Sequence, residues 1–201
     1  MSLRNKRGNC LPNHSERTVN NDALVLFYHI LSLPSLVANL NDCTMERRCL
    51  EINYTEYASK SELPAADAAL LAKAEEMTRS SYAPYSEFHV GAAIRMASGE
   101  IYGGANQENA AFPSGLCAER TALYYASAQH PDGVVESIAI AAEHQGSFTQ
   151  DIVTPCGACR QALAQYEVKS SKPIRVILGG RDRIVVFDSV ADLLPFVFDS
   201  I

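Results

Sequence analysis

Residues 88–106, FHVGAAIRMASGEIYGGAN, contain the pattern on which the fold prediction depends. The first part, FHVGAAIRMA, is a largely apolar run of strand length, and the Ser98-Gly99 dipeptide after it is typical of a tight hairpin turn. EIYGGAN then supplies the returning strand. The stretch therefore predicts a β-hairpin.

Helical and strand patterns alternate on both sides of this hairpin. Residues 64–80, PAADAALLAKAEEMTRS, combine helix-forming residues with one apolar face that contains Leu70, Leu71, Ala74 and Met77. Further along the chain, the pattern predicts three strands, SIAIAAE, PIRVILG and IVVF, and three helices, at about residues 117–129, 156–166 and 190–194. Strands that alternate with helices predict an α/β layered sandwich with a mixed sheet.

The composition favours a globular protein that acts on a small molecule. With 201 residues, 47% of them hydrophobic and 20% charged, the chain suits one compact domain with an appendage. A formal charge of -6 argues against a nucleic-acid partner, because such proteins usually carry a basic patch that neutralises phosphates. Six cysteines in a core-rich chain with a Cys-x-x-Cys motif indicate metal or redox chemistry in a reducing, cytoplasmic setting.

Residues 1–62 differ from the rest of the chain, and we expect them to be an N-terminal extension to an enzyme domain at residues 63–201. The apolar run from Ala23 to Leu40 is broken at Pro34, so its uninterrupted part is shorter than the roughly 20 residues of a membrane helix. An export signal is disfavoured because Asp22 directly precedes the run. A start at Met45 is the alternative to Met1, and no function is assigned to Cys10, Cys43 and Cys49.

Three cysteines lie at the predicted starts of two helices. Cys117 begins CAERTALYYASAQ, while Cys156 and Cys159 lie three apart in TPCGACRQAL, on one helix face. A helix N-terminus favours the thiolate, which is the form that binds zinc. Three protein ligands leave the fourth tetrahedral position open, which is typical of a catalytic zinc. The sequence therefore predicts one zinc ion held by these cysteines.

Charged residues beside the cysteines suggest how such a site would work. Glu119 is not needed as a ligand, so it is available as a general acid and base. Arg120 and Arg160 each follow a site residue and would offset the negative charge of three thiolates. Arg120 could equally be an ordinary surface residue of the helix.

Simpler interpretations exist for several of these residues. Cys156-x-x-Cys159 alone is also compatible with a redox pair or half of a structural zinc knuckle. On local pattern, Phe88 is a core residue of a strand and Asn106 is a turn residue after two glycines. Cys117 and Glu119 upstream are what favour a catalytic site.

The combination of CAE with a later PCxxC resembles the cytidine deaminase family, in its small branch with three cysteine ligands. PYSEFHVGAA and GGANQENAAFPSGLCAERTA are similar to the substrate-binding segments of that family. The resemblance runs from about Pro64 to the C-terminus. It implies a three-layer α/β/α sandwich with a mixed central sheet.

The resemblance also implies roles for individual residues. Cys117, Cys156 and Cys159 would hold one zinc ion per subunit, and Glu119 would move protons. Asn106 and Glu108 would bind the sugar hydroxyls of a nucleoside, as buried polar groups that reject a bare base. The remaining implied contacts are the ring packing of Phe88, the Ala118 backbone on the ring carbonyl, the Thr154 carbonyl facing the leaving amine, and Phe112 and Phe198 reaching into adjacent sites of a homotetramer.

The implied activity is hydrolytic deamination of cytidine and 2′-deoxycytidine to uridine and 2′-deoxyuridine, as in pyrimidine salvage. The alternatives are a deaminase of a modified nucleoside or nucleoside antibiotic, a deaminase of cytosine in polynucleotides, and a non-catalytic module stabilised by zinc. The acidic balance disfavours a polynucleotide substrate, whose phosphates require cationic contacts. The sequence leaves open the preference between ribose and deoxyribose.

Overall fold

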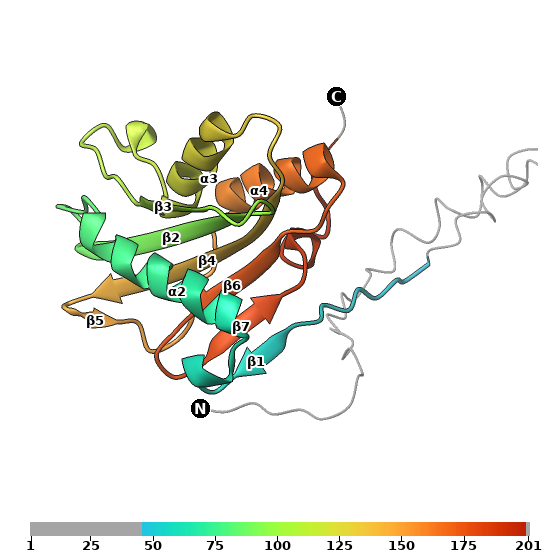
Figure 1. Cartoon of the computed structure of the whole chain (residues 1–201), viewed down its shortest axis with the longest axis horizontal. Coiled ribbons are helices and arrows are strands. Elements are labelled where there is room, and N and C mark those ends of the chain that lie inside the picture. The colour runs from blue at the N-terminus through green and yellow to red at the C-terminus, as the bar shows by residue number, and fades with distance from the viewer. Residues whose placement is uncertain (1–45, 200–201) are drawn as a thin grey trace, which may run out of the picture. The chain divides into compact units, whose positions relative to one another are not determined.

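The computed structural model of the chain describes residues 46–199. Residues 51–199 belong to one compact unit, built on a central twisted sheet (Figure 1). The strands of this sheet are β1 (Thr55–Tyr57), β2 (Phe88–Met96), β3 (Ile101–Ala105), β4 (Val135–His144), β5 (Ser147–Phe148), β6 (Arg175–Gly179) and β7 (Ile184–Phe187). Their order is β1-β7-β6-β4-β2-β3, with β5 paired to β4.

The sheet is mixed, as expected. β4 and β6 run parallel, with Ser137 opposite Arg175, and the other neighbouring pairs are antiparallel. A parallel pair needs a crossover connection, and a helix supplies it here. That helix is α4 (Gly157–Ser170), which follows β4 and β5 in the chain and leads into β6.

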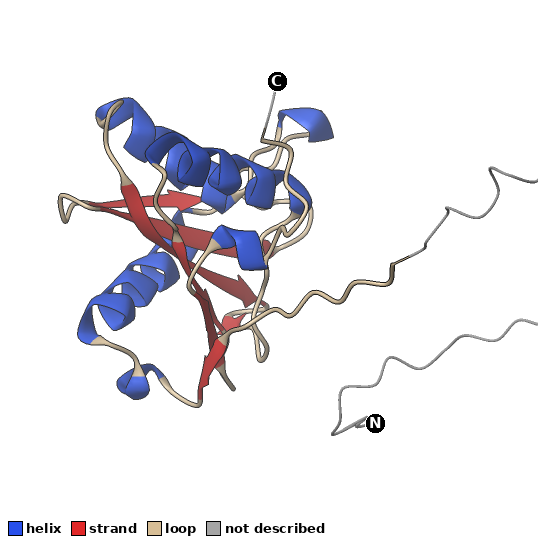
Figure 2. Ribbon diagram, turned by 90° about the vertical axis from the view of Figure 1, so that its right-hand side faces the viewer, coloured by secondary structure: helices blue, strands red, loops and turns tan. Residues whose placement is uncertain are grey.

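Helices cover both faces of the sheet (Figure 2). α2 (Ala65–Met77) lies on one face, and α3 (Ala118–Gln129) and α4 lie together on the other (Figure 1). Short 3-10 helices occur at Lys60–Glu62, Thr78–Ser80, Phe112–Ser114 and Val190–Asp192. The three-layer α/β/α sandwich is confirmed.

Strand β4 separates two apolar cores. Its residues alternate between faces, so Ile138 and Ile140 belong to the core beneath α3 and α4, whereas Ala139 and Ala141 belong to the core beneath α2. All four side chains are almost completely buried. A continuous apolar strand of this kind is typical of a sheet that is covered on both faces.

The hairpin prediction is confirmed by the pairing of β2 with β3. Gly99, in the turn, has a φ of 99°, which only glycine adopts without strain. α4 continues to Ser170, beyond the Tyr166 expected from the sequence, and the short closing helix is a 3-10 turn.

β1 is an edge strand inside the segment that the sequence assigns to the extension. Thr55–Tyr57 pair antiparallel with β7, Thr55 lying opposite Val186. The strand is three residues long and mostly polar, so its sequence carries no strand pattern. Its place in the sheet comes from pairing with a distant partner. The compact unit that contains β1 begins at about residue 51.

The apolar run from Ala23 to Leu40, the alternative start at Met45, and Cys10 and Cys43 lie outside the described residues. Cys49 is exposed and has a free thiol. Over residues 46–199, no helix is long and apolar enough to cross a membrane.

Candidate functional site

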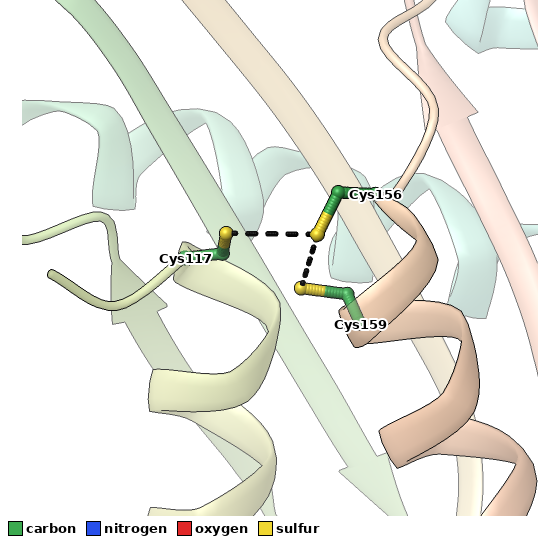
Figure 3. A group of neighbouring side chains, drawn as sticks. All are labelled: Cys117, Cys156 and Cys159. Atoms are coloured by element: carbon green, nitrogen blue, oxygen red, sulfur yellow. Dashed lines mark hydrogen bonds between the residues drawn. The ribbon is translucent and has the colours of Figure 1, made fainter. Parts of the chain in front are cut away.

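The starts of α3 and α4 meet above one face of the sheet (Figure 3). Cys117 is the N-cap of α3 and Cys156 is the N-cap of α4, both with extended backbone (ψ 152° and 166°). Cys159 lies in the first turn of α4 and is buried. The positive ends of two helix dipoles therefore lie at the cysteines and favour the anionic form of the thiols.

Close backbone packing fixes the position of α3. A Cβ atom on Gly104 of β3 would lie 2.4 Å from the Ala122 nitrogen and 2.9 Å from the Ala118 oxygen. Only glycine lets β3 approach the first turn of α3 this closely. The position of Cys117 therefore depends on the sheet beneath it.

The three sulfurs have the spacing of a zinc site. Cys156 Sγ lies 3.9 Å from Cys117 Sγ and 3.4 Å from Cys159 Sγ, and all three atoms lie within 4.8 Å of one another (Figure 3). A tetrahedral zinc with bonds of about 2.3 Å spaces its sulfurs about 3.8 Å apart. Within the described part of the chain, this is the one cluster of three cysteine, histidine or acidic side chains able to hold a metal ion.

Without metal, the cluster favours one thiolate. The neighbouring Cys159, together with Arg120 and Cys156, lowers the pKa of the Cys117 thiol to about 5. The interaction with Cys117, together with burial, raises the pKa of the Cys159 thiol. The Nη2 atom of Arg120 lies 3.9 Å from Cys117 Sγ. Its role in offsetting the charge of the thiolates stays a prediction.

Arg160 is placed differently from Arg120. Its guanidinium donates to the Pro155 carbonyl (2.8 Å), the Leu193 carbonyl (2.9 Å) and the Thr154 hydroxyl (3.3 Å). These contacts hold the two residues before Cys156 against the C-terminal segment. Arg160 therefore positions the segment before Cys156. Its influence on the charge of the thiolates stays a prediction.

Glu119 lies in the first turn of α3, two residues after Cys117, and is 5% exposed. Burial raises the pKa of its carboxyl above the ordinary value, and the nearby Cys117 adds to this effect. A carboxyl whose pKa is raised toward neutrality can both accept and return a proton. This placement suits the general acid and base expected from the sequence.

A cavity of about 370 Å³ opens beside Cys117. This volume lies within the range of small-molecule sites, roughly 300–1,000 Å³. Three of the predicted substrate residues line it, namely Asn106, Glu108 and Phe112. The other lining residues are Tyr85, Gln107, Asn109, Gly115, Leu116, Cys117 and Arg120. The cavity thus joins one cysteine of the cluster to the polar pair predicted to bind a sugar.

Both members of that polar pair are held by the start of β2 and the segment before it. The Asn106 side-chain oxygen accepts from the Ser81 hydroxyl (2.6 Å) and the Val90 N–H (2.8 Å), and its nitrogen donates to the Phe88 carbonyl (2.9 Å). The Glu108 carboxylate accepts from the Ser86 hydroxyl and from the Tyr85 N–H (2.9 Å), and these bonds lower its pKa. Glu108 is therefore an ionised hydrogen-bond acceptor at neutral pH.

Phe88, Ala118, Thr154 and Phe198 are not among the residues that line this cavity. Phe88 begins β2 and packs against the His144 ring, with centroids 5.9 Å apart. Ala118 is fully buried at the start of α3, and Thr154 is exposed before Cys156. Phe112 and Phe198 are 76% and 68% exposed. A role in a neighbouring site stays a prediction for these two rings.

Sequence reasoning did not single out Ser81, Tyr85 and Ser86. Ser81 and Ser86 orient Asn106 and Glu108, while Tyr85 lines the cavity and packs edge-on against Phe112, at 6.1 Å between centroids. The polar run SYAPYSE between the predicted helix and hairpin is the signal that could have identified them.

Comparison with known proteins places the chain in a family. The model of the cytidine and deoxycytidylate deaminase zinc-binding region matches residues 64–172. The chain is 40% identical over 131 residues to the cytidine deaminase of Halalkalibacterium halodurans, covering 65% of this chain and 92% of that protein. It is 39% identical over 133 residues to the cytidine deaminase of Sporosarcina psychrophila, covering 65% and 90%.

A solved structure agrees with this assignment. The crystal structure of cytidine deaminase from Burkholderia pseudomallei matches with a TM-score of 0.55 at 36% identity, over 65% of this chain and 97% of that one. The matched family region is a zinc-binding one, and the cysteine cluster in this chain has the spacing that zinc requires. The chain therefore belongs to the cytidine and deoxycytidylate deaminase family and carries its zinc site.

Proposed function

We propose that this protein is a hydrolase that deaminates cytidine and 2′-deoxycytidine to uridine and 2′-deoxyuridine, with release of ammonia. One observation carries the proposal: a single cavity joins Cys117 of the metal cluster to Asn106 and Glu108. The names of the relatives from Halalkalibacterium halodurans and Sporosarcina psychrophila, both cytidine deaminases, support the same substrate. The reaction would serve pyrimidine salvage.

We assign one zinc ion per chain to Cys117, Cys156 and Cys159. When bound there, zinc supplies Lewis acidity and an open fourth position at which water becomes a stronger acid. Glu119 would carry the two protons that one water molecule supplies, the first to the pyrimidine ring nitrogen and the second to the departing amine, which leaves as ammonia. Burial suits Glu119 to this task, because its carboxyl has a pKa above the ordinary value.

Substrate recognition would divide between contacts to the sugar, made in the cavity, and contacts to the base, made by neighbouring residues. Glu108 accepts hydrogen bonds, and its fixed position matches a hydroxyl donor on the sugar. Asn106 keeps one N–H of its amide beyond the bond to the Phe88 carbonyl, which leaves a donor for the sugar. At the base, we assign ring packing to Phe88, the ring carbonyl to the Ala118 backbone, and the leaving amine to the Thr154 carbonyl.

We further propose a homotetramer in the cytoplasm, with Phe112 and Phe198 entering neighbouring sites. Both rings are largely exposed, and large exposed aromatic groups commonly become buried at interfaces. Three thiols must stay reduced to hold a metal, which suits a reducing compartment. Residues before about Glu51 would be an extension without a part in the chemistry.

The test is a substrate panel of cytidine, 2′-deoxycytidine, cytosine and an oligonucleotide, run with and without a chelator and followed by ultraviolet absorbance. We expect both nucleosides to react and the chelator to stop the reaction, while cytosine and the oligonucleotide stay unchanged. Turnover of the oligonucleotide alone, or zinc-loaded protein that converts none of the four, would reject the proposal.

A further inference from the structure

The turn between β6 and β7 is hydrogen-bonded to the loop that leads into α4. The loop, residues 149–155, ends at Cys156, and the turn consists of residues 180–183. Backbone N–H groups of Arg181 and Asp182 donate to the carbonyls of Thr149 and Gln150, both at 2.9 Å. The turn therefore continues the pairing of the sheet onto a loop that is not itself a strand.

Gly180 brings the turn into contact with the middle of this loop. A Cβ atom at this position would lie 2.7 Å from the Asp151 carbonyl carbon and 2.8 Å from the Ile152 nitrogen. Both neighbours are backbone atoms, which cannot move aside as the end of a flexible side chain can. Any residue larger than glycine must therefore displace the loop or the turn.

Arg183 forms a bidentate ion pair with Asp151 of the same loop. Its Nε lies 2.7 Å from Asp151 Oδ1 and its Nη2 lies 3.2 Å from Asp151 Oδ2, while Nη1 lies 3.0 Å from a Glu56 carboxylate oxygen in β1. Paired contacts of this kind fix direction as well as distance. Hydrogen bonds from Arg183 lower the pKa of Asp151, so the carboxylate is ionised at neutral pH.

We propose that Gly180 and Arg183 are positioning residues for the metal site, acting on the Asp151 loop to set where Cys156 and Cys159 begin α4. Cys156 follows Asp151 by five residues, and Arg160 holds Thr154 and Pro155 between them. The turn lies beyond residues 64–172, the part matched by the family model. The proposal rests on the proposed function only for its effect on turnover, because zinc retention can be measured without substrate.

The expected effect of the ion pair is small and specific. Exposed pairs are weak, and the Arg183 and Asp151 side chains are 36% and 67% exposed. We expect Arg183→Ala to accelerate zinc release to a chelator about two- to fivefold and to lower kcat by a similar factor. KM for cytidine should stay unchanged, because Asn106 and Glu108 are held by a different segment.

Arg181→Ala is the matched control, because its side chain reaches only Asp182 of the same turn, at 4.0 Å. We expect Arg181→Ala to release zinc at the rate of the unmodified protein. Arg183→Lys should release zinc at a rate between those of the unmodified protein and Arg183→Ala. Asp151→Asn should accelerate zinc release more than Glu56→Gln does, because Asp151 belongs to the loop and Glu56 belongs to β1. Gly180→Ala should have the largest effect, about tenfold or more, if the variant folds.

Three results would overturn the proposal. The first is equal zinc release from the Arg183→Ala and Arg181→Ala variants, and the second is a lower melting temperature of Arg183→Ala with unchanged zinc release. The third is an effect of Glu56→Gln on zinc release that equals that of Asp151→Asn, since Arg183 would then act through β1. Zinc release that follows the expected order without any cytidine turnover would support the positioning role and reject the proposed function.

Discussion

The two helix starts that form the metal site are supported in opposite ways. α3 rests directly on the sheet, where Gly104 allows backbone to touch backbone. α4 begins at the end of a loop whose position depends on the Arg160 side chain and on a turn beyond β6. α3 begins with one cysteine of the metal cluster and carries Glu119, the proposed general acid and base, whereas α4 begins with the other two cysteines. The proposed proton carrier thus lies on the helix that packs directly against the sheet, and two of the three metal-binding cysteines lie on the helix that a loop positions.

The sharpest test of this division removes one group from each helix. We expect Glu119→Gln to lower kcat by about a hundred- to ten-thousandfold while zinc stays bound, because the proton carrier is lost but no ligand is. Cys159→Ser, at a buried ligand, should lose zinc and activity together. Metal content and absorbance assays measure both effects.

Glu76→Gln, at an exposed position of α2, is the control for loss of a carboxylate and should change neither quantity. If Glu119→Gln kept full activity, the carboxyl could not be the proton carrier.

Substitution of Gly104 tests the close packing of α3 on β3. The new Cβ of Gly104→Ala would meet backbone atoms of α3 at 2.4 and 2.9 Å, so the helix must shift or the strand must bend. We expect the free energy of unfolding to fall by about 1–3 kcal/mol, the usual cost of overpacking. Urea denaturation measures this change, and an unchanged midpoint would show that α3 does not depend on close contact with β3.

Chemical labelling can distinguish the two helix starts in zinc-free protein. The pKa of Cys117 is lowered to about 5 and that of Cys159 is raised, so at pH 7 the α3 cysteine is the thiolate and the buried α4 cysteine is not. We expect iodoacetamide to modify Cys117 at least tenfold faster than Cys159, and the rate to fall as the pH drops below about 5. Peptide mapping by mass spectrometry gives both rates, and faster modification of Cys159 would reverse the assignment.

The smallest expected effect comes from Gly157, the first residue of α4. A Cβ atom there meets nothing within 4 Å, in contrast to Gly104. Gly157→Ala should therefore leave unfolding unchanged or stabilise the protein by less than about 1 kcal/mol, because alanine restricts the unfolded chain. A loss of stability as large as that of Gly104→Ala would mean that α4 is packed as tightly as α3.

Local patterns explain what the sequence could predict. The hairpin, the helix faces and the cysteine spacing each depend on residues that are close together in the chain, and the structure agrees with all three. The sequence pattern does not predict β1, because its three residues become a strand only by pairing with β7. Predictions from periodicity have no access to a partner more than a hundred residues away.

The two arginines show the same limit within the site. Arg120 and Arg160 each follow a site residue directly, so the sequence suggested the same role for both. In the structure, Arg120 lies near a sulfur and Arg160 binds two carbonyls, one of them at Leu193. The difference depends on where the C-terminal segment passes, which no local motif contains.

We propose that one zinc ion on the three cysteines is what makes this chain a deaminase. Stepwise addition of zinc to zinc-free protein tests this, with cytidine deamination followed by absorbance. We expect activity to rise in proportion to added zinc and to level off at about one ion per chain, as three ligands with one open position require. Full activity before zinc is added, or none when one ion is bound to the cysteines, would contradict it.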